Sequence, residues 1–312
     1  MRLALVGCGG VGRAFIKLLE DKQNALKARG LFLRLTHTID VENSADYDKM
    51  LARHKADMLV LATPTDKESG EPGYSYIKAA FKHGMHVVTA DKGPILLAYH
   101  ELKKMAENNG VKLGIGCTTG GALPAINAGE MALAGADILS IEGILNGASN
   151  FILEEMREQH KSFNEALAEA QRLGIAETDP SLDVEGWDTA IKLLILTNVL
   201  LNENKRLADV EVRGITGLNR YDLNQATHAG LRYKLVGRSA YVNNRLLMKV
   251  EPLVFGPQHP YYHVEGKNKV VRYTTDTLGE LTISGGASGV FAAAASLLRD
   301  IINIALCFSD KP

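Results

Sequence analysis

The first third of the chain alternates short apolar runs with longer stretches in which apolar residues recur at helical spacing. Strands are predicted near 2–6, 31–39, 57–61, 86–89 and 111–115, and helices between them to about 28 and near 44–54, 73–83 and 94–108. Repeated strand–helix units are typical of a doubly wound parallel sheet. We therefore predict an α/β domain at the N-terminus.

The pattern changes after residue 115. Helices are predicted near 124–133, 150–159, 162–173, 187–201 and 219–231, a strand near 137–145, and antiparallel strands over 232–283 with a hairpin turn at Asn243 and Asn244. A small-residue apolar helix follows the glycine-rich turn 285–289. The pattern predicts a first domain over 1–133, completed by a C-terminal helix over 286–312, and a second α+β domain over 134–285.

A glycine-rich turn joins the first predicted strand to the first helix. Gly7, Gly9 and Gly12 follow the pattern G-x-G-x-x-G, with Gly10 and Val11 inside it. In dinucleotide-binding domains the first glycine permits the tight turn, the second lets a pyrophosphate approach, and the third lets the helix pack close to the strand. Amide groups at the helix start then face the anion. We predict a Rossmann domain that binds a dinucleotide here, rather than a turn without a ligand.

The residues near the end of the second predicted strand do not decide between NAD and NADP. Asp40 lies further from Gly12 than the usual spacing of about 20 residues for an acid that binds the adenosine ribose. It favours NAD only weakly. Arg34, Lys49 and Arg53 lie nearby in the sequence and suit a 2′-phosphate instead.

Two further strand ends carry polar residues. Thr63 and Pro64 follow the strand at 57–61, while Thr89 closes the next strand and Lys92 follows it. Ligands of open parallel sheets lie beyond the carboxyl ends of the strands. These residues are candidates for cofactor binding, and Lys92 is also a candidate for catalysis, although a lysine on a turn is often only solvated.

The composition argues against some classes of binding partner. The 312 residues carry 35 Lys and Arg against 36 Asp and Glu, a formal net charge of -1, and no basic block points to nucleic acid or an anionic membrane. We see neither a signal peptide nor an apolar segment of the roughly 20 residues that span a membrane. The 3 cysteines are too scattered for a disulfide framework or a zinc cluster. We expect a cytoplasmic protein that binds small polar molecules.

The stretch 176–192 gathers carboxylates ahead of a lysine. Its charged residues are Glu177, Asp179, Asp183, Glu185, Asp188 and Lys192. Pro180 and Gly186 are typical turn residues, so a loop is predicted to become a helix near Gly186. Asp188 and Lys192 then share one helix face, one turn apart. Spacing alone is equally typical of an acidic helix N-terminus with a solvated ion pair.

Together these segments resemble the homoserine dehydrogenases over nearly the whole chain. The matching segments are 7–12, 62–65, 90–92, 143–147, 176–180 and 183–188 with Lys192. The resemblance implies a Rossmann domain, a mixed catalytic and dimerisation domain, a homodimer, and reversible interconversion of L-homoserine and L-aspartate 4-semialdehyde with NAD or NADP, within threonine and methionine biosynthesis. Some members carry a C-terminal ACT domain for feedback. This chain ends before one, so we expect it to be insensitive by that route.

The resemblance also implies roles for single residues. Lys192 would give a proton to the nascent alkoxide during semialdehyde reduction and take it back in oxidation, with Lys92 assisting or sharing the task. Glu177 and Asp188 would hold the substrate's amino group or its bridging water, with Asp183 in support. Further substrate-binding residues are Asn146, Gly147 and Ser149, and Gly286 is expected on the nicotinamide side.

The direction of proton transfer carries an expectation about pH. A lysine with its ordinary pKa of about 10.4 is a proton donor at neutral pH, whereas use as a base requires a lower pKa or a higher pH. Burial lowers the pKa of a lysine and a nearby carboxylate raises it. We expect homoserine oxidation to improve with rising alkalinity, and semialdehyde reduction to work near neutrality.

Three departures from the family's pattern affect the site. Many members have a glutamate where this chain has 116–119, so only a weak sodium site is predicted, at Thr119, Gly121 and Leu123. Ala148 stands where a threonine usually follows Asn-Gly, and Ser149 is expected to compensate for the missing hydroxyl. The late glycine-rich turn 285–289 also differs from the usual G-x-G-A-G.

Two other functions compete with this interpretation. Cys117 precedes threonines and glycines, as a thioester-forming nucleophile of an aldehyde dehydrogenase would. No histidine partner for it is identifiable, and the acidic stretch with its lysine would be unexplained. A nucleotide sensor without enzymatic activity would need the glycine turn but not the residues around Lys192.

Overall fold

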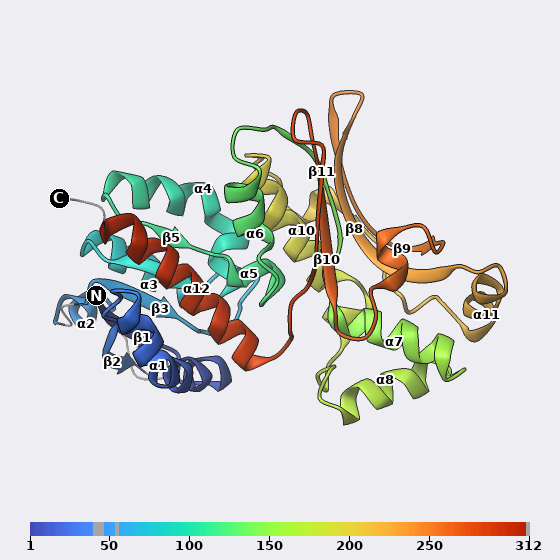
Figure 1. Ribbon diagram of the computed structural model, residues 1–312, viewed down its shortest axis with the longest axis horizontal. Helices are drawn as coiled ribbons and strands as arrows, with labels where there is room; N and C mark the ends of the chain where they lie inside the picture. Colours follow the sequence, from blue (N-terminus) through green and yellow to red (C-terminus); the bar gives the residue numbers. More distant parts are fainter. Residues whose placement is uncertain (40–46, 54–55, 310–312) are drawn as a thin grey trace. The chain divides into compact units, whose positions relative to one another are not determined.

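The computed structural model describes residues 1–39, 47–53 and 56–309 (Figure 1). The chain forms two compact units, the first made of Met1–Pro124 with Gly289–Pro312 and the second of Ala125–Ser288. The predicted boundary after residue 133 comes too late, because residues after Pro124 pack inside the second unit. Tyr273 Oη donates a hydrogen bond of 2.6 Å to the Ala125 carbonyl, and a Cβ on Gly129 would meet Leu200 Cδ1 at 2.5 Å.

The first unit is built on a five-stranded sheet in the order β2-β1-β3-β4-β5. Its strands are β1 (Arg2–Val6), β2 (Arg34–Ile39), β3 (Met58–Leu61), β4 (His86–Thr89) and β5 (Leu113–Gly114). All neighbouring strands pair in parallel. Its longer helices are α1 (Gly10–Ala28), α2 (Tyr47–Arg53), α3 (Gly73–Lys82), α4 (Lys92–Asn108) and α12 (Val290–Ser309). The predicted α/β fold with a parallel sheet is confirmed.

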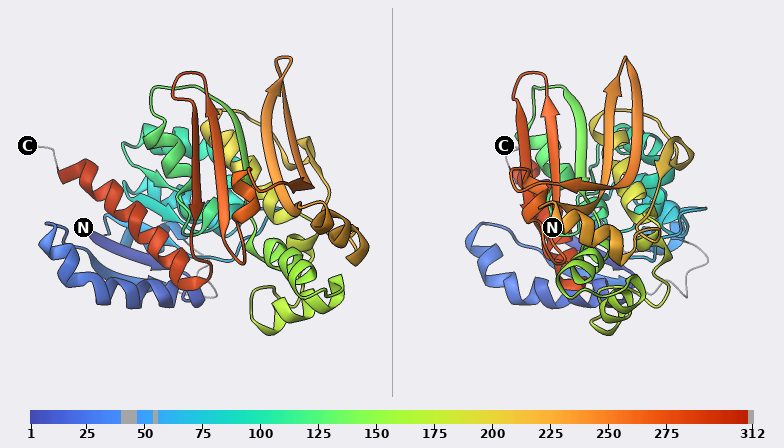
Figure 2. Two further views of the ribbon diagram at one scale, coloured as in Figure 1. Left: turned by 45° about the vertical axis from the view of Figure 1, so that its right-hand side comes forward. Right: turned by 90° about the vertical axis from the view of Figure 1, so that its right-hand side faces the viewer.

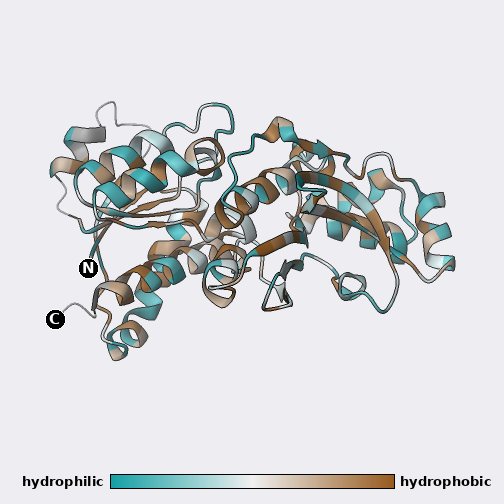
Figure 3. Cartoon of the chain, turned by 90° about the horizontal axis from the view of Figure 1, so that it is seen from above, coloured by the Kyte–Doolittle hydropathy of each residue, from teal (hydrophilic) through white to brown (hydrophobic). Residues whose placement is uncertain are grey.

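The core of this unit explains why its strands are apolar runs. Residues 3–6 of β1 and all residues of β3 are buried because helices cover both faces of a parallel sheet. Leu3 and Leu5 of β1 share one cluster with Phe15 of α1 and with Leu297 and Ile301 of α12. Strand ribbons in Figure 3 are accordingly largely brown, while teal marks turns and outer helix surfaces.

Helix α12 has the length and composition of a membrane span over Val290–Cys307. The expectation that no segment reaches this length overlooked it. Its Leu297 and Ile301 are fully buried against the first unit's sheet and α1. Helices that are apolar on nearly all sides also occur as core helices of globular domains, and α12 packs as one here.

The second unit is built on a six-stranded mixed sheet in the order β11-β10-β6-β8-β9-β7. Its strands are β6 (Ile138–Ile144), β7 (Val210–Val212), β8 (Arg232–Val242), β9 (Arg245–Phe255), β10 (Lys269–Thr275) and β11 (Glu280–Gly285). Only the pair β7–β9 is parallel in this described sheet. Figure 2 shows β10 and β11 beside β6, and β8 and β9 as a long hairpin.

Helices of the second unit surround the ends and one face of this sheet. They are α6 (Ala125–Asn127), the π-helical turn η2 (Ala128–Ala132), α7 (Gly147–Glu158), α8 (Phe163–Arg172), α9 (Ser181–Val184), α10 (Trp187–Leu200) and α11 (Arg220–His228). Short turns complete it at η3 (Leu207–Asp209) and η4 (Pro260–His263), and α5 (Cys117–Gly120) belongs to the first unit. The helix predicted near 124–133 is thus a short α-turn followed by a π-helical turn.

Two paired glycines bring α10 close to the sheet. Gly143 of β6 lies opposite Gly237 of β8. A Cβ on Gly237 would meet Thr189 Cγ2 at 3.0 Å and Leu193 Cβ at 3.5 Å. Since Thr189 and Leu193 belong to α10, this helix covers the centre of the sheet on that face. The contact fixes the helix that carries Asp188 and Lys192.

Candidate active site

The acidic stretch folds as a loop, the short helix α9 and the start of α10. Gly186 joins the two helices with φ of +91°, a conformation that glycine adopts without the steric cost of a Cβ. A Cβ there would meet side-chain atoms of Val250 and Val212 at 3.2 and 3.3 Å. The turn therefore aims α10 along the sheet and sets Asp188 in its first turn.

Asp188 and Lys192 form a buried ion pair. Lys192 Nζ lies 2.5 Å from Asp188 Oδ2, and each side chain is only 13% exposed. Lys192 Nζ also donates to the Leu145 carbonyl at 2.9 Å, just beyond the end of β6. The alternative of a solvated surface pair is therefore wrong. A buried charge is costly unless it is paired and hydrogen-bonded, so this geometry is closely specified.

Asn146 joins this pair to a second carboxylate. Its Nδ2 donates to Asp183 Oδ1 at 2.6 Å and to Asp188 Oδ2 at 2.8 Å. Its Oδ1 accepts from the Ser149 amide at 2.8 Å, which caps α7. One side chain just beyond the end of β6 thus links residues of α7, α9 and α10. We call Asn146, Asp183, Asp188 and Lys192 the carboxylate–lysine cluster.

Gly147 and Ser149 lie beside the cluster at the start of α7. A Cβ on Gly147 would meet the Lys267 carbonyl oxygen at 2.8 Å, so any side chain would displace the backbone there. Ser149 is fully buried, and its Oγ donates to the Asn146 carbonyl at 3.3 Å. Both residues hold the turn that presents Asn146.

Glu177 does not join the carboxylate–lysine cluster. It is exposed on the loop after α8, and its backbone carbonyl accepts from Gln171 Nε2 at 3.1 Å. Within the described residues, no hydrogen bond or ion pair links its carboxylate to Asp188 or Lys192. Its predicted role in binding the substrate's amino group stays a prediction.

In the first unit, the three glycines of the fingerprint have different reasons to be glycine. Gly7 has φ of +93°, and a Cβ there would meet the Ala62 carbonyl oxygen at 2.4 Å. A Cβ on Gly12 would meet the Gly7 carbonyl oxygen at 2.0 Å. A Cβ on Gly9 would have nothing within 4 Å. Protein packing therefore explains two of the glycines, and the third leaves room for a ligand.

The start of α1 fits an anionic cofactor. Gly9 caps the helix without a side chain, so no side chain accepts from the first amides. Gly10 is exposed and Val11 is half-buried at this helix start. Exposed amides at a helix N-terminus bind phosphate groups, which fits a dinucleotide. Asp40 lies outside the described residues, and Arg34 is exposed at the start of β2.

The ends of β3 and β4 are joined by a buried carboxylate that the sequence interpretation missed. Asp91 Oδ2 accepts from Thr63 Oγ1 at 2.8 Å, and Asp91 Oδ1 accepts from the Gly93 amide at 2.9 Å. The Asp91 amide donates to Thr89 Oγ1 at 2.9 Å. Burial raises the pKa of Asp91 to about 6, against the opposing effect of the hydrogen bonds from Thr63 and Gly93.

This carboxylate fixes the start of α4, whose first residue is Lys92. Asp91 is the N-cap of α4, and the Lys92 amide donates to Thr65 Oγ1 at 3.3 Å. Thr63 and Thr89 are buried, whereas Pro64 is exposed. An aspartate directly before a helix is the sequence signal that could have identified Asp91 as a cap.

The surroundings of Cys117 do not favour a nucleophile of a thioester route. Its side chain is buried, and burial raises the pKa of the thiol to about 12. Its Sγ lies 3.5 Å from the Ala293 carbonyl oxygen. The thiolate is the reactive form of cysteine, and the raised pKa disfavours it. The burial of this thiol therefore argues against an aldehyde dehydrogenase that uses Cys117.

The predicted sodium site lies at the end of α5 and on the turn that follows it. Thr119 Oγ1 is buried without a hydrogen-bond partner in the described chain, Gly121 has φ of +59°, and Leu123 is buried. One orphaned hydroxyl is short of the several oxygen ligands that a hard cation takes. The described residues contain no group of three or more His, Cys, Asp or Glu side chains that could hold a metal ion. The sodium site remains a prediction.

Gly286 lies on the turn after β11 and is contacted by a residue that the sequence interpretation missed. Its φ is +77°, and its carbonyl accepts from Lys269 Nζ at 3.5 Å. Lys269 is the first residue of β10 and is buried. A lysine in an alternating antiparallel strand is normally expected to face solvent, so nothing in the strand pattern indicates this burial.

Comparisons with known proteins match both units. A family model described as homoserine dehydrogenase matches residues 124–302, and one described as an oxidoreductase family with an NAD-binding Rossmann fold matches residues 1–117. A homoserine dehydrogenase of Methanocaldococcus jannaschii is 35% identical, over 97% of this chain and 98% of its own length. An NAD(+)-dependent homoserine dehydrogenase of Pseudomonas canavaninivorans is 34% identical, over 97% of this chain and 96% of its own.

Solved structures agree with these relatives. A homoserine dehydrogenase from Thiobacillus denitrificans superposes with a TM-score of 0.90 at 27% identity, covering 99% of this chain and 74% of that one. A structure described as a putative homoserine dehydrogenase from Archaeoglobus fulgidus has a TM-score of 0.88 at 31% identity, covering 97% of this chain and 99% of that one.

Proposed function

The chain belongs to the homoserine dehydrogenase family, and on that premise we propose that the carboxylate–lysine cluster binds the substrate and moves its proton. The protein is an NAD(P)-dependent oxidoreductase that interconverts L-homoserine and L-aspartate 4-semialdehyde. The observation that carries the proposal is the buried Asp188–Lys192 pair, which Asn146 and the Leu145 carbonyl hold in place.

The carboxylates of the cluster suit the substrate's amino group. Asp183 and Asp188 place two carboxylates in the cluster that holds Lys192, and carboxylates bind ammonium groups through charge-assisted hydrogen bonds. Homoserine and its semialdehyde both carry an ammonium group. We assign that group to Asp183 and Asp188, whose oxygens Asn146 holds on one side.

Lys192 suits the proton transfer. Its ammonium group has three donors, and the described residues use two of them, one toward Asp188 and one toward the Leu145 carbonyl. The third N–H is available to the reacting oxygen. Lys192 then donates a proton to the alkoxide that forms in semialdehyde reduction, and accepts the hydroxyl proton in homoserine oxidation. Lys92, at the start of α4, assists or shares this step.

A bound NAD or NADP would supply the redox chemistry, because its nicotinamide exchanges a hydride. Gly7, Gly9 and Gly12 with the first turn of α1 are proposed to hold its pyrophosphate. Asp40 is proposed to bind the adenosine ribose. Thr63, Pro64, Thr89, Lys92 and Gly286 are proposed as further cofactor contacts. Use of NADP besides NAD is part of the proposal, and Arg34 is the described residue that suits a 2′-phosphate.

We also propose a homodimer that works in the cytoplasm, without nucleic-acid or membrane partners, in threonine and methionine biosynthesis. The outer face of the second unit's sheet supports the dimer. Side chains of β8 and β9 line a groove of about 260 Å³ there, including Val236, Val242, Leu247 and Leu253. Val242 and Leu247 are 46% and 38% exposed, a large fraction for apolar side chains on one strand pair.

A steady-state assay tests the proposed function. L-homoserine is offered with NAD+ and separately with NADP+, and reduced nicotinamide and L-aspartate 4-semialdehyde are measured. The proposal expects homoserine-dependent turnover with at least one cofactor. Cofactor binding without turnover would instead support the nucleotide sensor. Sedimentation of the same sample tests the dimer, and a monomer at assay concentrations would contradict it.

A further inference from the structure

Lys269 is a buried cation on the face of the six-stranded sheet that α10 covers, and α10 is the helix that carries Asp188 and Lys192. It is the first residue of β10 and only 5% exposed. The pairing of Val270 with Ile144 places Lys269 beside Leu145, whose carbonyl binds Lys192 Nζ. Side chains alternate along a strand, so Lys269 shares its face with Tyr273.

The helix-covered face can be followed across the sheet. Tyr273 pairs with Ile141, which is two residues from Gly143, and Gly143 pairs with Gly237. Helix α10 packs directly on Gly237. Lys269 therefore projects on the side of the sheet that carries Asp188 and Lys192.

The ammonium group of Lys269 has only neutral partners. Its Nζ donates to Ser288 Oγ at 3.0 Å and to the Gly286 carbonyl at 3.5 Å. No carboxylate in the described part of the chain forms an ion pair with it. Buried lysines are rare unless paired, because burial penalises an unpaired charge. A role in binding or catalysis would explain why the chain retains a buried lysine without a carboxylate partner among the described residues.

The cluster acts on this ammonium through space. Burial, together with the like charge of Lys192, lowers the pKa of Lys269 to about 8, and the carboxylate of Asp188 opposes this shift. The charges of Lys192 and Asp188 therefore both shift the pKa of Lys269, although neither of these described side chains forms a hydrogen bond or ion pair with it. Such an arrangement leaves the ammonium available to an anion that enters the same site.

The substrate brings that anion. Homoserine has three groups that need partners: an ammonium, a hydroxyl and an α-carboxylate. The carboxylate–lysine cluster provides for the first two, whereas the carboxylates of Asp183 and Asp188 would repel the third. A further cation completes the charge balance of a zwitterionic substrate. Resting on the proposed function, we propose that Lys269 binds the α-carboxylate of homoserine and of the semialdehyde, with Ser288 positioning its ammonium group.

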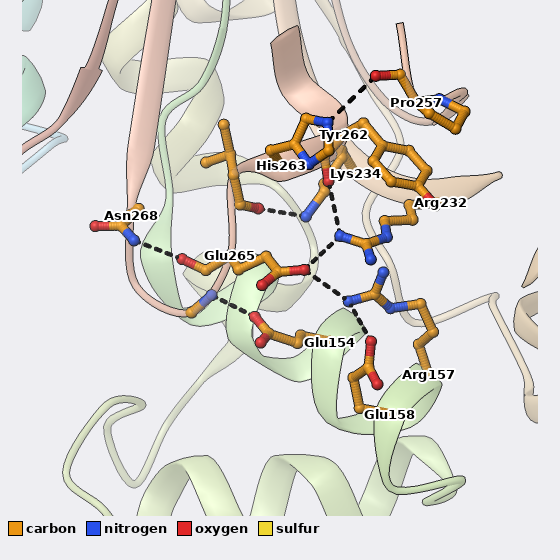
Figure 4. A network of polar contacts seen from close by, with 12 residues as sticks. Glu154, Arg157, Glu158, Arg232, Lys234, Pro257, Tyr262, His263, Glu265 and Asn268 are labelled. Atoms are coloured by element: carbon orange, nitrogen blue, oxygen red, sulfur yellow. Dashed lines mark hydrogen bonds and ion pairs between the residues drawn. The ribbon is translucent and has the colours of Figure 1, made fainter. Parts of the chain in front are cut away.

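Lys234 provides a matched control within the same sheet. It is also buried, and its pKa is also lowered to about 8, chiefly by burial. Its Nζ donates to Asn150 Oδ1 at 3.0 Å and to the Val264 carbonyl. Figure 4 shows it near Arg232 and Glu265. Lys234 lies an odd number of residues from Gly237, so it projects from the opposite face.

The experiment compares two ligands that differ only in the carboxylate. The KM of L-homoserine and the inhibition constant of 3-aminopropan-1-ol, which lacks the carboxylate, are measured in wild type, Lys269→Met and Lys234→Met. Loss of one partner of a desolvated charge pair is expected to raise the homoserine KM about 100-fold in Lys269→Met. The inhibition constant of 3-aminopropan-1-ol should stay within about twofold. Lys234→Met should change neither constant by a comparable factor.

Several outcomes would overturn the proposal. Equal weakening of both ligands in Lys269→Met would show a general structural role, and an unchanged homoserine KM would show no role in binding. Lys269→Gln, which retains a polar group for Ser288, must show the same selective loss, and it replaces Lys269→Met if that variant does not fold. Lys269→Arg, which keeps the charge, must recover part of the selectivity. Absence of homoserine turnover in wild type would reject the proposed function itself, a distinct result.

Discussion

Lys192 Nζ lies 2.5 Å from Asp188 Oδ2, one turn along the same helix, with both side chains almost withdrawn from solvent. Ion pairs at this spacing are common on helix surfaces and contribute little to stability there. In the protein interior, breaking such an ion pair has a much larger energetic cost. Removing one partner of a buried pair leaves an uncompensated charge, so a protein that retains such a pair constrains both side chains closely.

Asp188→Asn should weaken homoserine binding while leaving the shape of the side chain unchanged. The variant loses the carboxylate that we assign to the substrate ammonium and leaves Lys192 without its partner. The KM of homoserine should rise about 100-fold, in line with truncation of a buried charge pair, and the dissociation constant of NAD should not change. Glu185→Gln is the control, because Glu185 is an exposed carboxylate of the same stretch. Equal effects of the two substitutions would refute the assignment.

Asn146 is expected to serve both the fold and the site, and two substitutions separate these roles. Asn146→Ser keeps an N-cap for α7, whereas Asn146→Ala removes it at a cost of about 1 kcal/mol. Neither can bridge Asp183 and Asp188. Both variants should therefore raise the homoserine KM by a similar factor, and Asn146→Ala should lower the denaturation midpoint further than Asn146→Ser does. A normal KM in Asn146→Ser would show that the bridge does not matter for binding.

Gly9 and Gly12 should respond to alanine in opposite ways. A Cβ on Gly9 has nothing within 4 Å, while one on Gly12 would meet the Gly7 carbonyl oxygen at 2.0 Å. Gly9→Ala should keep the melting temperature and raise the dissociation constant of NAD by about tenfold or more, because the methyl group occupies the approach of the pyrophosphate. Gly12→Ala should lower the melting temperature. Thermal unfolding and cofactor titration measure both effects, and unchanged NAD affinity in Gly9→Ala would contradict the assignment.

Asp91 should make stability depend on pH. Its pKa is raised from its ordinary value of 3.8 to about 6, so the folded chain holds this proton more tightly than the unfolded chain does. Its contribution to the free energy of unfolding is therefore most favourable below about pH 4 and is lost as the pH rises through about 6. Asp91→Asn removes the buried charge and should be more stable than wild type at pH 7, by about 1–3 kcal/mol.

Denaturant titrations of wild type and Asp91→Asn at pH 4.5 and pH 7 check this expectation. The difference in the free energy of unfolding between the two proteins should grow with pH. The reason is that folded wild type loses the Asp91 proton as the pH rises through about 6, whereas the amide in Asp91→Asn has no such proton to lose. Asp91→Ala should instead be destabilised at both pH values, since it also loses the cap of α4 and the acceptor for Thr63. A constant difference between wild type and Asp91→Asn would argue against a raised pKa.

The sequence predicted the first unit well because parallel strands between two helix layers must be apolar runs. The strands predicted at 2–6, 57–61 and 86–89 correspond closely to β1, β3 and β4. The strand predicted over 31–39 begins only at Arg34, because its first residues close the turn after α1. β7 and α9 were missed because each is only a few residues long.

The sequence identified most residues of the site but not how they are arranged in space. Helical spacing is visible in a sequence, so Asp188 and Lys192 could be paired in advance. Asn146 could be recognised as a cap, but its bridge to Asp183 and Asp188 exists only because the end of β6 meets α9 and α10 in the folded chain. The burial of Lys269 depends on its neighbours across the sheet, which strand alternation does not reveal.

The proposed function depends on proton transfer by Lys192. Its most direct test is the kcat of homoserine oxidation in Lys192→Met, measured beside wild type and Lys92→Met, with NAD affinity determined for each protein. We expect kcat to fall by about 10³-fold in Lys192→Met, within the range for loss of a general acid–base group, while NAD affinity stays at the wild-type value. A kcat within about tenfold of wild type would contradict the account.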